Sequence, residues 1–150
     1  MTQPDTELTL QVALTFAVSQ EQVFAAWTDP ESVRRWFGPR DFSNPSDEMD
    51  VRVGGAYRIA MRGPDGETFY AVGTYREVSP PERLVFSWGW EASPDARESI
   101  VTVEFFERGG GTEVVLTHVG LADTASRDSH QDGWDGTLER LAAVLTRDQA

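Results

Sequence analysis

The sequence predicts a single α+β domain over residues 1–150, in which a meander sheet packs against a long C-terminal helix. Apolar residues occupy every second position from Leu8 to Val18, which is typical of a half-buried strand. Turn sequences then recur between residues 49 and 119, as expected for successive hairpins. Near the end, helical spacing places five apolar residues on one stripe: Trp134, Leu138, Leu141, Ala142 and Leu145.

Two short helices are predicted after the first strand. Ser19 and Gln22 have the spacing of a capping box, which opens the first helix. Asp29-Pro30 then supplies a cap residue and a proline at the first helical position, and Gly38-Pro39 ends the second helix. The inward residues are Val23, Phe24 and Trp27 in the first helix and Val33, Trp36 and Phe37 in the second. Residues up to Glu48 are predicted to form a loop.

Six further strands are predicted from the apolar runs between the turn sequences. Two lie within residues 49–61, on either side of Gly54-Gly55, and the others at 69–78, 83–90, 99–107 and 112–119. GPDG forms the turn before residue 69, SPPE the turn after residue 78 and RGGG the turn after residue 107, with a polar loop after residue 90. Ser129 is then predicted to cap a final helix that runs to about Arg147.

The hairpin turns also predict which residues share a face of the sheet. Pairing Val78 with Arg83 across the SPPE turn places Tyr75 opposite Phe86. The residues on that face are then Phe69, Ala71, Gly73, Tyr75, Leu84, Phe86, Trp88 and Trp90. Pairing Glu107 with Thr112 aligns Val101, Val103 and Phe105 with Val114, Leu116 and His118. We expect the apolar stripe of the last helix to cover this aromatic face.

Composition excludes several classes of function. The 13 basic residues are all arginine and face 25 acids, so the net charge is -12 and neither nucleic acid nor an anionic membrane surface is an expected partner. Without lysine or cysteine, the chain cannot form a Schiff base, a P-loop, a thiolate metal site or a disulfide. No apolar run is long enough to span a membrane and no signal peptide is visible, so we expect a cytoplasmic protein.

Five segments, in order, resemble the START-like helix-grip superfamily (SRPBCC). They read VFAAWTDPESVRRWFGP, MDVRVGGAYRIAM, GTYREVSPPERLVFSW, VTVEFFERGGGTEVVLTHVGL and GWDGTLERLAAVL, and are most similar to the C-terminal domain of the activator of the heat-shock protein 90 ATPase. The resemblance implies a curved antiparallel sheet of about seven strands wrapped around the C-terminal helix, with a cavity between them. It also implies that the two short helices close one end of the sheet.

The resemblance implies three alternative functions, because members bind lipids, hormones or polyketides, act as cyclases, or assist a chaperone. Our first hypothesis is a protein that binds a small hydrophobic or aromatic molecule in the cavity. The alternatives are a cyclase-type enzyme that uses the same pocket and a chaperone-associated module. Eukaryotic activators carry a further N-terminal domain that docks on the chaperone, whereas only 7 residues precede the first strand here, so a chaperone contact is the weaker expectation.

The predicted ligand-binding residues lie on the face that the last helix covers. They are Tyr57, Met61, Tyr75, Phe86, Trp88, Val103, His118, Trp134 and Leu138. Apolar walls with a few polar groups are typical of a small-molecule site, and the five tryptophans and eight phenylalanines favour one. No residue is assigned a catalytic role, and no cofactor is expected.

Both histidines have an alternative interpretation. His118 lies in phase with the inward residues, where it is either a general base or, the interpretation we favour, a hydrogen-bonded core residue. His130 lies near Asp128 and Asp132, which suggests a metal site. Polar residues at a solvated helix start are more commonly caps and acids favoured by the helix dipole, so we expect no metal site.

Two glycines flank Trp134 in the final helix. Gly133 and Gly136 are one turn apart, and a glycine inside a helix costs about 1 kcal/mol relative to alanine. They either let a loop approach the helix backbone or leave open space beside Trp134 as a cavity mouth. The sequence does not decide between these alternatives.

Overall fold

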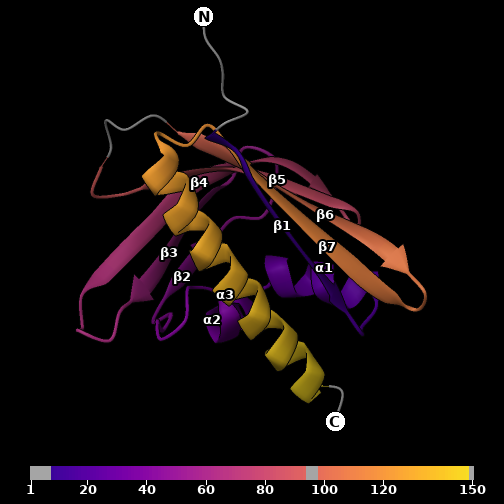
Figure 1. Cartoon of the computed structure of the whole chain (residues 1–150). Helices are drawn as coiled ribbons and strands as arrows, with labels where there is room; N and C mark the ends of the chain where they lie inside the picture. Colours follow the sequence, from indigo (N-terminus) through magenta and orange to yellow (C-terminus); the bar gives the residue numbers. More distant parts are fainter. Residues whose placement is uncertain (1–7, 94–97, 149–150) are drawn as a thin grey trace, which may run out of the picture.

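Seven strands form one antiparallel sheet that curves around a long helix in this computed structural model, which describes residues 8–93 and 98–148 (Figure 1). The strands are β1 (Leu10–Phe16), β2 (Asp47–Met49), β3 (Ala56–Arg62), β4 (Thr68–Ser79), β5 (Arg83–Trp90), β6 (Ser99–Arg108) and β7 (Gly111–Val119). The helices are α1 (Gln20–Thr28), α2 (Pro30–Trp36) and α3 (Thr124–Asp148). The strand order is β1-β7-β6-β5-β4-β3-β2, and α1 and α2 lie at one end of the sheet. The predicted helix-grip fold is confirmed.

The predicted caps of the two short helices are present. The Ser19 hydroxyl accepts from the backbone N–H of Gln22 at 3.2 Å, and the Gln22 side chain accepts from the backbone N–H of Ser19 at 3.3 Å. Asp29 Oδ1 accepts from the backbone N–H of Glu31 at 3.1 Å, and Pro30 is the first residue of α2. Each cap satisfies a backbone donor that the helix itself leaves free.

The last helix begins earlier than the sequence predicts. It starts at Thr124, and Asp123 Oδ1 accepts from the backbone N–H of Ser126 at 2.7 Å, so Asp123 is the residue that caps it. The prediction that Ser129 is the cap is therefore wrong. Ser129 and His130 instead lie in the second turn of α3, inside the helix.

The strand pairing agrees with the prediction except at one turn. Glu107 pairs with Thr112 and Tyr75 pairs with Phe86, as predicted. A bulge between Tyr75 and Glu77 shifts the register by one residue, so Arg83 pairs with Ser79, and the predicted pairing of Val78 with Arg83 is wrong. The predicted polar loop after β5 lies partly outside the described residues, which omit 94–97.

The turn between β2 and β3 requires its glycine. A Cβ on Gly55 would overlap the backbone carbonyl oxygen of Asp50, so no other residue allows the two segments to approach this closely. The turn thereby brings β2 beside β3, where Asp47 pairs with Ile59. The first strand is also shorter than the predicted 8–18, and β2 begins at Asp47, inside the predicted loop.

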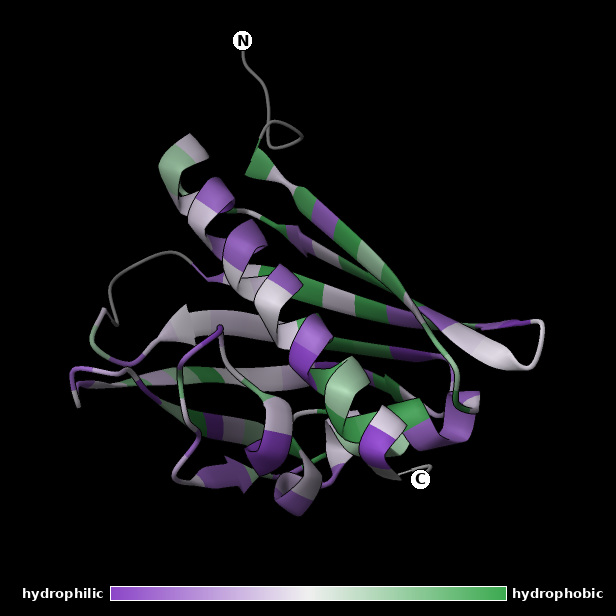
Figure 2. Cartoon of the chain, turned by 60° about the horizontal axis from the view of Figure 1, so that its bottom comes forward, coloured by the Kyte–Doolittle hydropathy of each residue, from purple (hydrophilic) through white to green (hydrophobic). Residues whose placement is uncertain are grey.

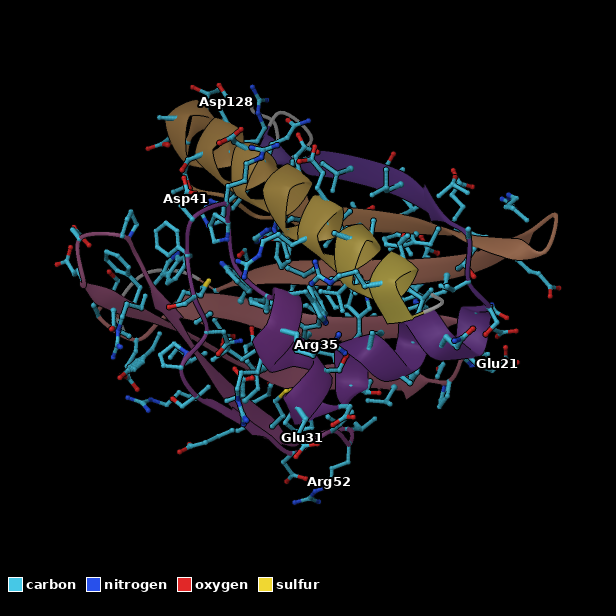
Figure 3. The ribbon with its side chains drawn as sticks, turned by 90° about the horizontal axis from the view of Figure 1, so that it is seen from below. Glu21, Glu31, Arg35, Asp41, Arg52 and Asp128 are labelled. Atoms are coloured by element: carbon cyan, nitrogen blue, oxygen red, sulfur yellow. The ribbon has the colours of Figure 1, made fainter. Side chains whose placement is uncertain are left out.

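The core lies between the sheet and α3. The buried side chains on the inner face of α3 are Trp134, Leu138, Leu141, Val144 and Leu145. In Figure 2 the outward face of α3 carries several purple, hydrophilic residues, while the strands beneath it carry green, apolar residues. Charged side chains such as Glu21, Glu31 and Arg52 point away from the body of the protein (Figure 3).

No helix in residues 8–93 and 98–148 is both long and apolar enough to cross a membrane.

Candidate ligand-binding cavity

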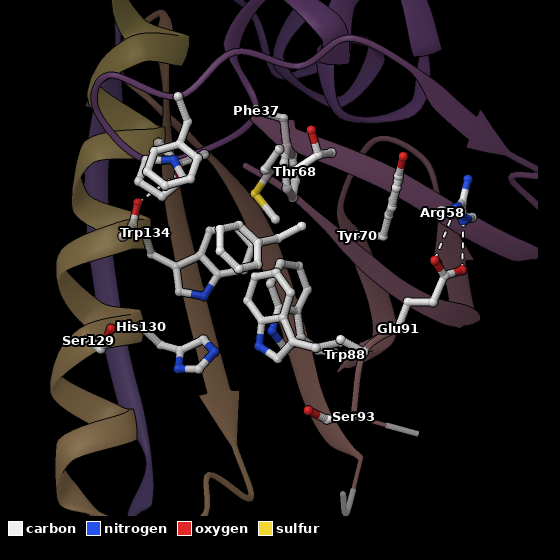
Figure 4. A pocket seen from close by; sticks show the side chains of 18 residues that line it. Phe37, Arg58, Thr68, Tyr70, Trp88, Glu91, Ser93, Ser129, His130 and Trp134 are labelled. Carbon is white, nitrogen blue, oxygen red and sulfur yellow. Dashed lines mark hydrogen bonds and ion pairs between the residues drawn. The ribbon is translucent and has the colours of Figure 1, made fainter. Parts of the chain in front are cut away.

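A cavity of about 950 Å³ lies between the first half of α3, strands β3 to β5 and the segment that follows α2 (Figure 4). Its aromatic lining comprises Phe37, Phe42, Phe69, Tyr70, Trp88, Trp90, His130 and Trp134. Small-molecule sites are usually about 300–1,000 Å³ and mostly apolar. Phe69 is 42% exposed, so the cavity presents apolar surface to solvent.

Regular spacing in two elements builds the cavity wall. The face of α3 toward the cavity consists of His130, Gly133, Trp134 and Thr137. Their spacing of three and four residues places them on one side of a helix. On β5, Trp88 and Trp90 are two residues apart and point to the same face of the sheet. Figure 4 shows Trp134 and His130 reaching from α3 toward Trp88.

The third wall is the segment 37–42, which Arg140 fastens to α3. The Nη1 of Arg140 donates to the carbonyl oxygens of Gly38 at 3.1 Å, Pro39 at 3.1 Å and Phe42 at 2.8 Å. Hydrogen bonds from a charged donor are stronger than those between neutral groups. Pro39 and Phe42 are therefore held against α3 as a fixed cavity wall.

The two glycines of α3 have different roles. A Cβ on Gly136 would lie 3.1 Å from the Cγ of Arg40 and 3.3 Å from its backbone nitrogen, so Gly136 lets the segment 37–42 approach the helix. Gly133 lines the cavity, and a Cβ there would meet only the Cγ of Pro39, at 3.7 Å. Both alternatives left open by the sequence therefore apply: Gly136 lets a loop approach the helix backbone, and Gly133 leaves open space beside Trp134.

His118 is a core residue held by a chain of hydrogen bonds. The indole Nε1 of Trp134 donates to His118 Nδ1 at 3.1 Å. Because an indole only donates, His118 carries its proton on Nε2, which donates to Ser99 Oγ at 2.7 Å. Ser99 in turn donates to the carbonyl oxygen of Trp88 at 3.3 Å. Burial, assisted by His130, lowers the pKa of His118 to about 3, so the ring is neutral at physiological pH.

The nine predicted ligand-binding residues fall into three groups. Met61, Trp88 and Trp134 line the large cavity. Tyr57, Tyr75 and Phe86 line a second space of about 20 Å³, which holds about one water molecule. The other three, Val103, His118 and Leu138, are buried and line neither space.

His130 lines the cavity but is absent from the predicted set. Its Nδ1 lies 2.7 Å from the carbonyl oxygen of Ser126, and its ring centroid is 6.4 Å from that of Trp88. The incorrect helix start placed it at a solvated cap, whereas its spacing of four residues before Trp134 indicates a shared face. In the part of the chain that the structure describes, no three His, Asp or Glu side chains form a group that could hold a metal ion.

An ion pair lies at the edge of the cavity. Arg58 donates from Nε to Glu91 Oε2 at 2.7 Å and from Nη2 to Oε1 at 3.0 Å. The Arg58 guanidinium also lies 3.7 Å from the centroid of the Tyr70 ring. The two charges satisfy each other, so the pair fixes the side chains at this edge of the cavity without presenting a free charge to it.

Comparisons with known proteins agree with this fold. The model of the family described as "Activator of Hsp90 ATPase homolog 1-like protein" matches residues 17–146. The human activator of 90 kDa heat shock protein ATPase homolog 1 is 21% identical over 131 residues, or 87% of this chain. The chain spans only 34% of that relative's length.

Solved structures extend the similarity to nearly the whole chain. The crystal structure of the AHSA1 protein from Silicibacter pomeroyi is 30% identical, with a TM-score of 0.83 over 93% of this chain and 99% of that one. The solution structure of the AHSA1-like protein from Aeromonas hydrophila is 27% identical, with a TM-score of 0.77 over 94% of both chains. Because the family model covers most of its length, the chain belongs to the family of activator of Hsp90 ATPase homolog 1-like proteins.

Proposed function

We propose that the protein binds a small, uncharged aromatic molecule in the cavity between α3 and the sheet. The observation that carries this proposal is the aromatic lining of a space of about 950 Å³ that begins at the exposed ring of Phe69. A ligand that covers such apolar surface gains about 25 cal/mol of binding free energy for each Å² that it removes from water. The net charge of -12 favours a neutral ligand over an anion.

The neutral probe N-phenyl-1-naphthylamine tests this proposal. It has about 17 non-hydrogen atoms. A binding free energy of about 0.5 kcal/mol for each of them corresponds to a Kd of about 1 µM. Because Trp88, Trp90 and Trp134 line the cavity, bound probe quenches tryptophan emission by energy transfer. We expect a saturable titration with one site. A probe that leaves tryptophan emission unchanged up to its solubility limit would refute the proposal.

Gly133→Leu shows whether the probe occupies this cavity. The added side chain extends beside Pro39 into the space that Gly133 leaves open, so we expect a loss of probe affinity of at least about tenfold. The variant also removes a glycine from a helix interior, which favours the fold by about 1 kcal/mol. Gln131→Leu is the matched control, because it adds the same side chain on the exposed face of α3 and should bind the probe normally.

His118, Tyr57 and Tyr75 do not line this cavity, so they are not placed to act there as acids or bases of a cyclase-type enzyme. Both ring nitrogens of His118 are hydrogen-bonded within the core. Tyr57 donates its hydroxyl proton to the carbonyl oxygen of Ser87, and Tyr57 and Tyr75 line only the small second space. This arrangement favours binding over catalysis by these three residues.

Membership of the family favours one alternative, activation of a heat-shock protein 90 ATPase. The named human relative supports it, although the matched region is only 34% of that protein. Stimulation of the ATPase of purified heat-shock protein 90 by this chain would support the alternative. If the contact is made by the outer surface, Gly133→Leu should stimulate as well as the wild type, because its new side chain lies inside the cavity.

A further inference from the structure

Two neighbouring residues of the cavity wall each have a buried polar atom with no hydrogen-bond partner within the described residues. These atoms are the Nε2 of His130 and the Nε1 of Trp88. The two rings are neighbours, with centroids 6.4 Å apart, and Figure 4 shows them side by side below Trp134. Buried polar groups are nearly always hydrogen-bonded, so a pair of free ones in a cavity indicates the polar group of a ligand.

The free atom of His130 is an acceptor. Its Nδ1 lies 2.7 Å from the carbonyl oxygen of Ser126, and a carbonyl oxygen can only accept, so Nδ1 carries the proton. In the neutral ring, Nε2 then has a lone pair without a partner within the described residues. The ring cannot turn over to donate from Nε2 without giving up the bond to Ser126.

The free atom of Trp88 is a donor, because an indole nitrogen can only donate. The other cavity tryptophan with a buried indole, Trp134, gives its proton to His118. Trp36, outside the cavity, gives its proton to the carbonyl oxygen of Ala26. Trp88 therefore differs from these two in holding an unused donor at the wall of an aromatic space.

Among the buried polar side-chain atoms of the wall residues, only these two atoms of His130 and Trp88 lack a partner in the part of the chain that the structure describes. Arg58 and Glu91 pair with each other, and the hydroxyl of Thr137 donates to the carbonyl oxygen of Gly133 at 2.7 Å. Thr68 accepts from Arg62 at 3.3 Å. Recognition of a polar group on the ligand is thus assigned to the part of the wall formed by His130 and Trp88.

We propose that the ligand is a neutral aromatic molecule with a hydroxyl group, which donates to His130 Nε2 and accepts from Trp88 Nε1. This inference rests on the proposed binding function. A hydroxyl supplies both roles from one oxygen atom, whereas a carboxylate can only accept and would leave His130 unpaired. An ammonium can only donate and would leave Trp88 unpaired. The rest of the molecule packs against the aromatic rings of the wall.

Three naphthalenes of similar size separate the contribution of the hydroxyl to the affinity from that of the rings. The set is 2-naphthol, 2-methoxynaphthalene and 2-methylnaphthalene, each competing with N-phenyl-1-naphthylamine. We expect 2-naphthol to bind about tenfold more tightly than 2-methylnaphthalene, since two hydrogen bonds separate them. The methoxy compound can accept from Trp88 but cannot donate to His130, so its affinity should be clearly below that of 2-naphthol.

Variants then assign the preference to the two side chains. His130→Phe and Trp88→Phe should each reduce the ratio of 2-naphthol to 2-methylnaphthalene affinity to about threefold or less, because each removes one of the two bonds. The affinity for 2-methylnaphthalene reports that the cavity of each variant is intact. Thr68→Val is the control, since Figure 4 places Thr68 well away from His130, and its ratio should remain that of the wild type.

Each result decides one of the two proposals. Equal affinity of the wild type for 2-naphthol and 2-methylnaphthalene would overturn the hydroxyl assignment and leave the cavity as an apolar binding site. An undiminished ratio in both His130→Phe and Trp88→Phe would also overturn it, because the hydroxyl would then bind elsewhere. Failure of all three naphthalenes to bind would refute the binding function itself.

Discussion

The buried ring of His118 makes the stability of the protein depend on pH in a way that one substitution removes. In the folded state, Nδ1 accepts from Trp134 and Nε2 donates to Ser99, so there is no place for a second proton. Burial accordingly lowers the pKa of His118 to about 3, from a value of about 6.5 in the unfolded chain. His118→Phe keeps a ring in this position and removes the titrating group.

The sign and size of the effect follow from proton linkage. Between pH 6.5 and about 3, the unfolded chain binds a proton at His118 that the folded protein does not bind, so the free energy of unfolding falls as the pH falls. The slope approaches about 1.4 kcal/mol for each pH unit below pH 6, and the integrated loss is about 2 kcal/mol between pH 7 and pH 5. His118→Phe loses the hydrogen bonds at every pH but has no such slope.

Urea unfolding followed by far-ultraviolet circular dichroism at pH 7, 6 and 5 measures this difference. The advantage of the wild type over His118→Phe should shrink by about 2 kcal/mol from pH 7 to pH 5. Other titrating groups are common to both proteins and cancel in the comparison. A difference that stays constant to within about 0.5 kcal/mol would mean that His118 is protonated in the folded state, contrary to the hydrogen-bonded arrangement.

Three further substitutions test the core, a buried acid and the fastened cavity wall. Leu141→Ala should lower the free energy of unfolding by about 2–5 kcal/mol, because Leu141 is fully buried on the inner face of α3; an unchanged urea midpoint would contradict its place in the core. Burial raises the pKa of Asp47 to about 6, so its ionised form destabilises the fold above that pH. Asp47→Asn should therefore stabilise the protein by about 1 kcal/mol at pH 7, reduced for partial exposure, and the gain should disappear near pH 4; a gain independent of pH would contradict this. Arg140→Met should cost about 1–3 kcal/mol and speed hydrogen exchange in residues 38–42, and unchanged exchange there would show that Arg140 does not hold the segment.

Local patterns predicted the fold well because neighbouring residues decide them. The capping box at Ser19 and the register of Glu107 with Thr112 depend on side chains a few positions apart, and both are present. The pairing of Val78 with Arg83 failed because a bulge after Tyr75 adds one residue to β4. Nothing in the residues around Tyr75 distinguishes a bulged strand from a regular one.

The cavity was predicted less completely, since it depends on how far apart two elements lie. Alternation placed Tyr57, Phe86 and Trp88 on the correct face, but alternation does not say which part of a face remains open. Tyr57 and Phe86 pack closely, whereas Trp88 borders the large cavity. His130 was missed for a different reason: Ser129 resembles a cap, and the cap at Asp123 was overlooked.

The indole N–H signals of the protein allow the binding site to be located by nuclear magnetic resonance. The chain has five tryptophans, of which Trp88, Trp90 and Trp134 line the cavity, while Trp36 is bonded to Ala26 within the core. Titration of 15N-labelled protein with 2-methylnaphthalene should shift the indole signals of the three cavity tryptophans together and saturate with one site. The signal of Trp36 should stay in place. Shifts in the signal of Trp36 without shifts in those of Trp88 and Trp90, or no shifts at all, would show that the cavity does not bind aromatic molecules.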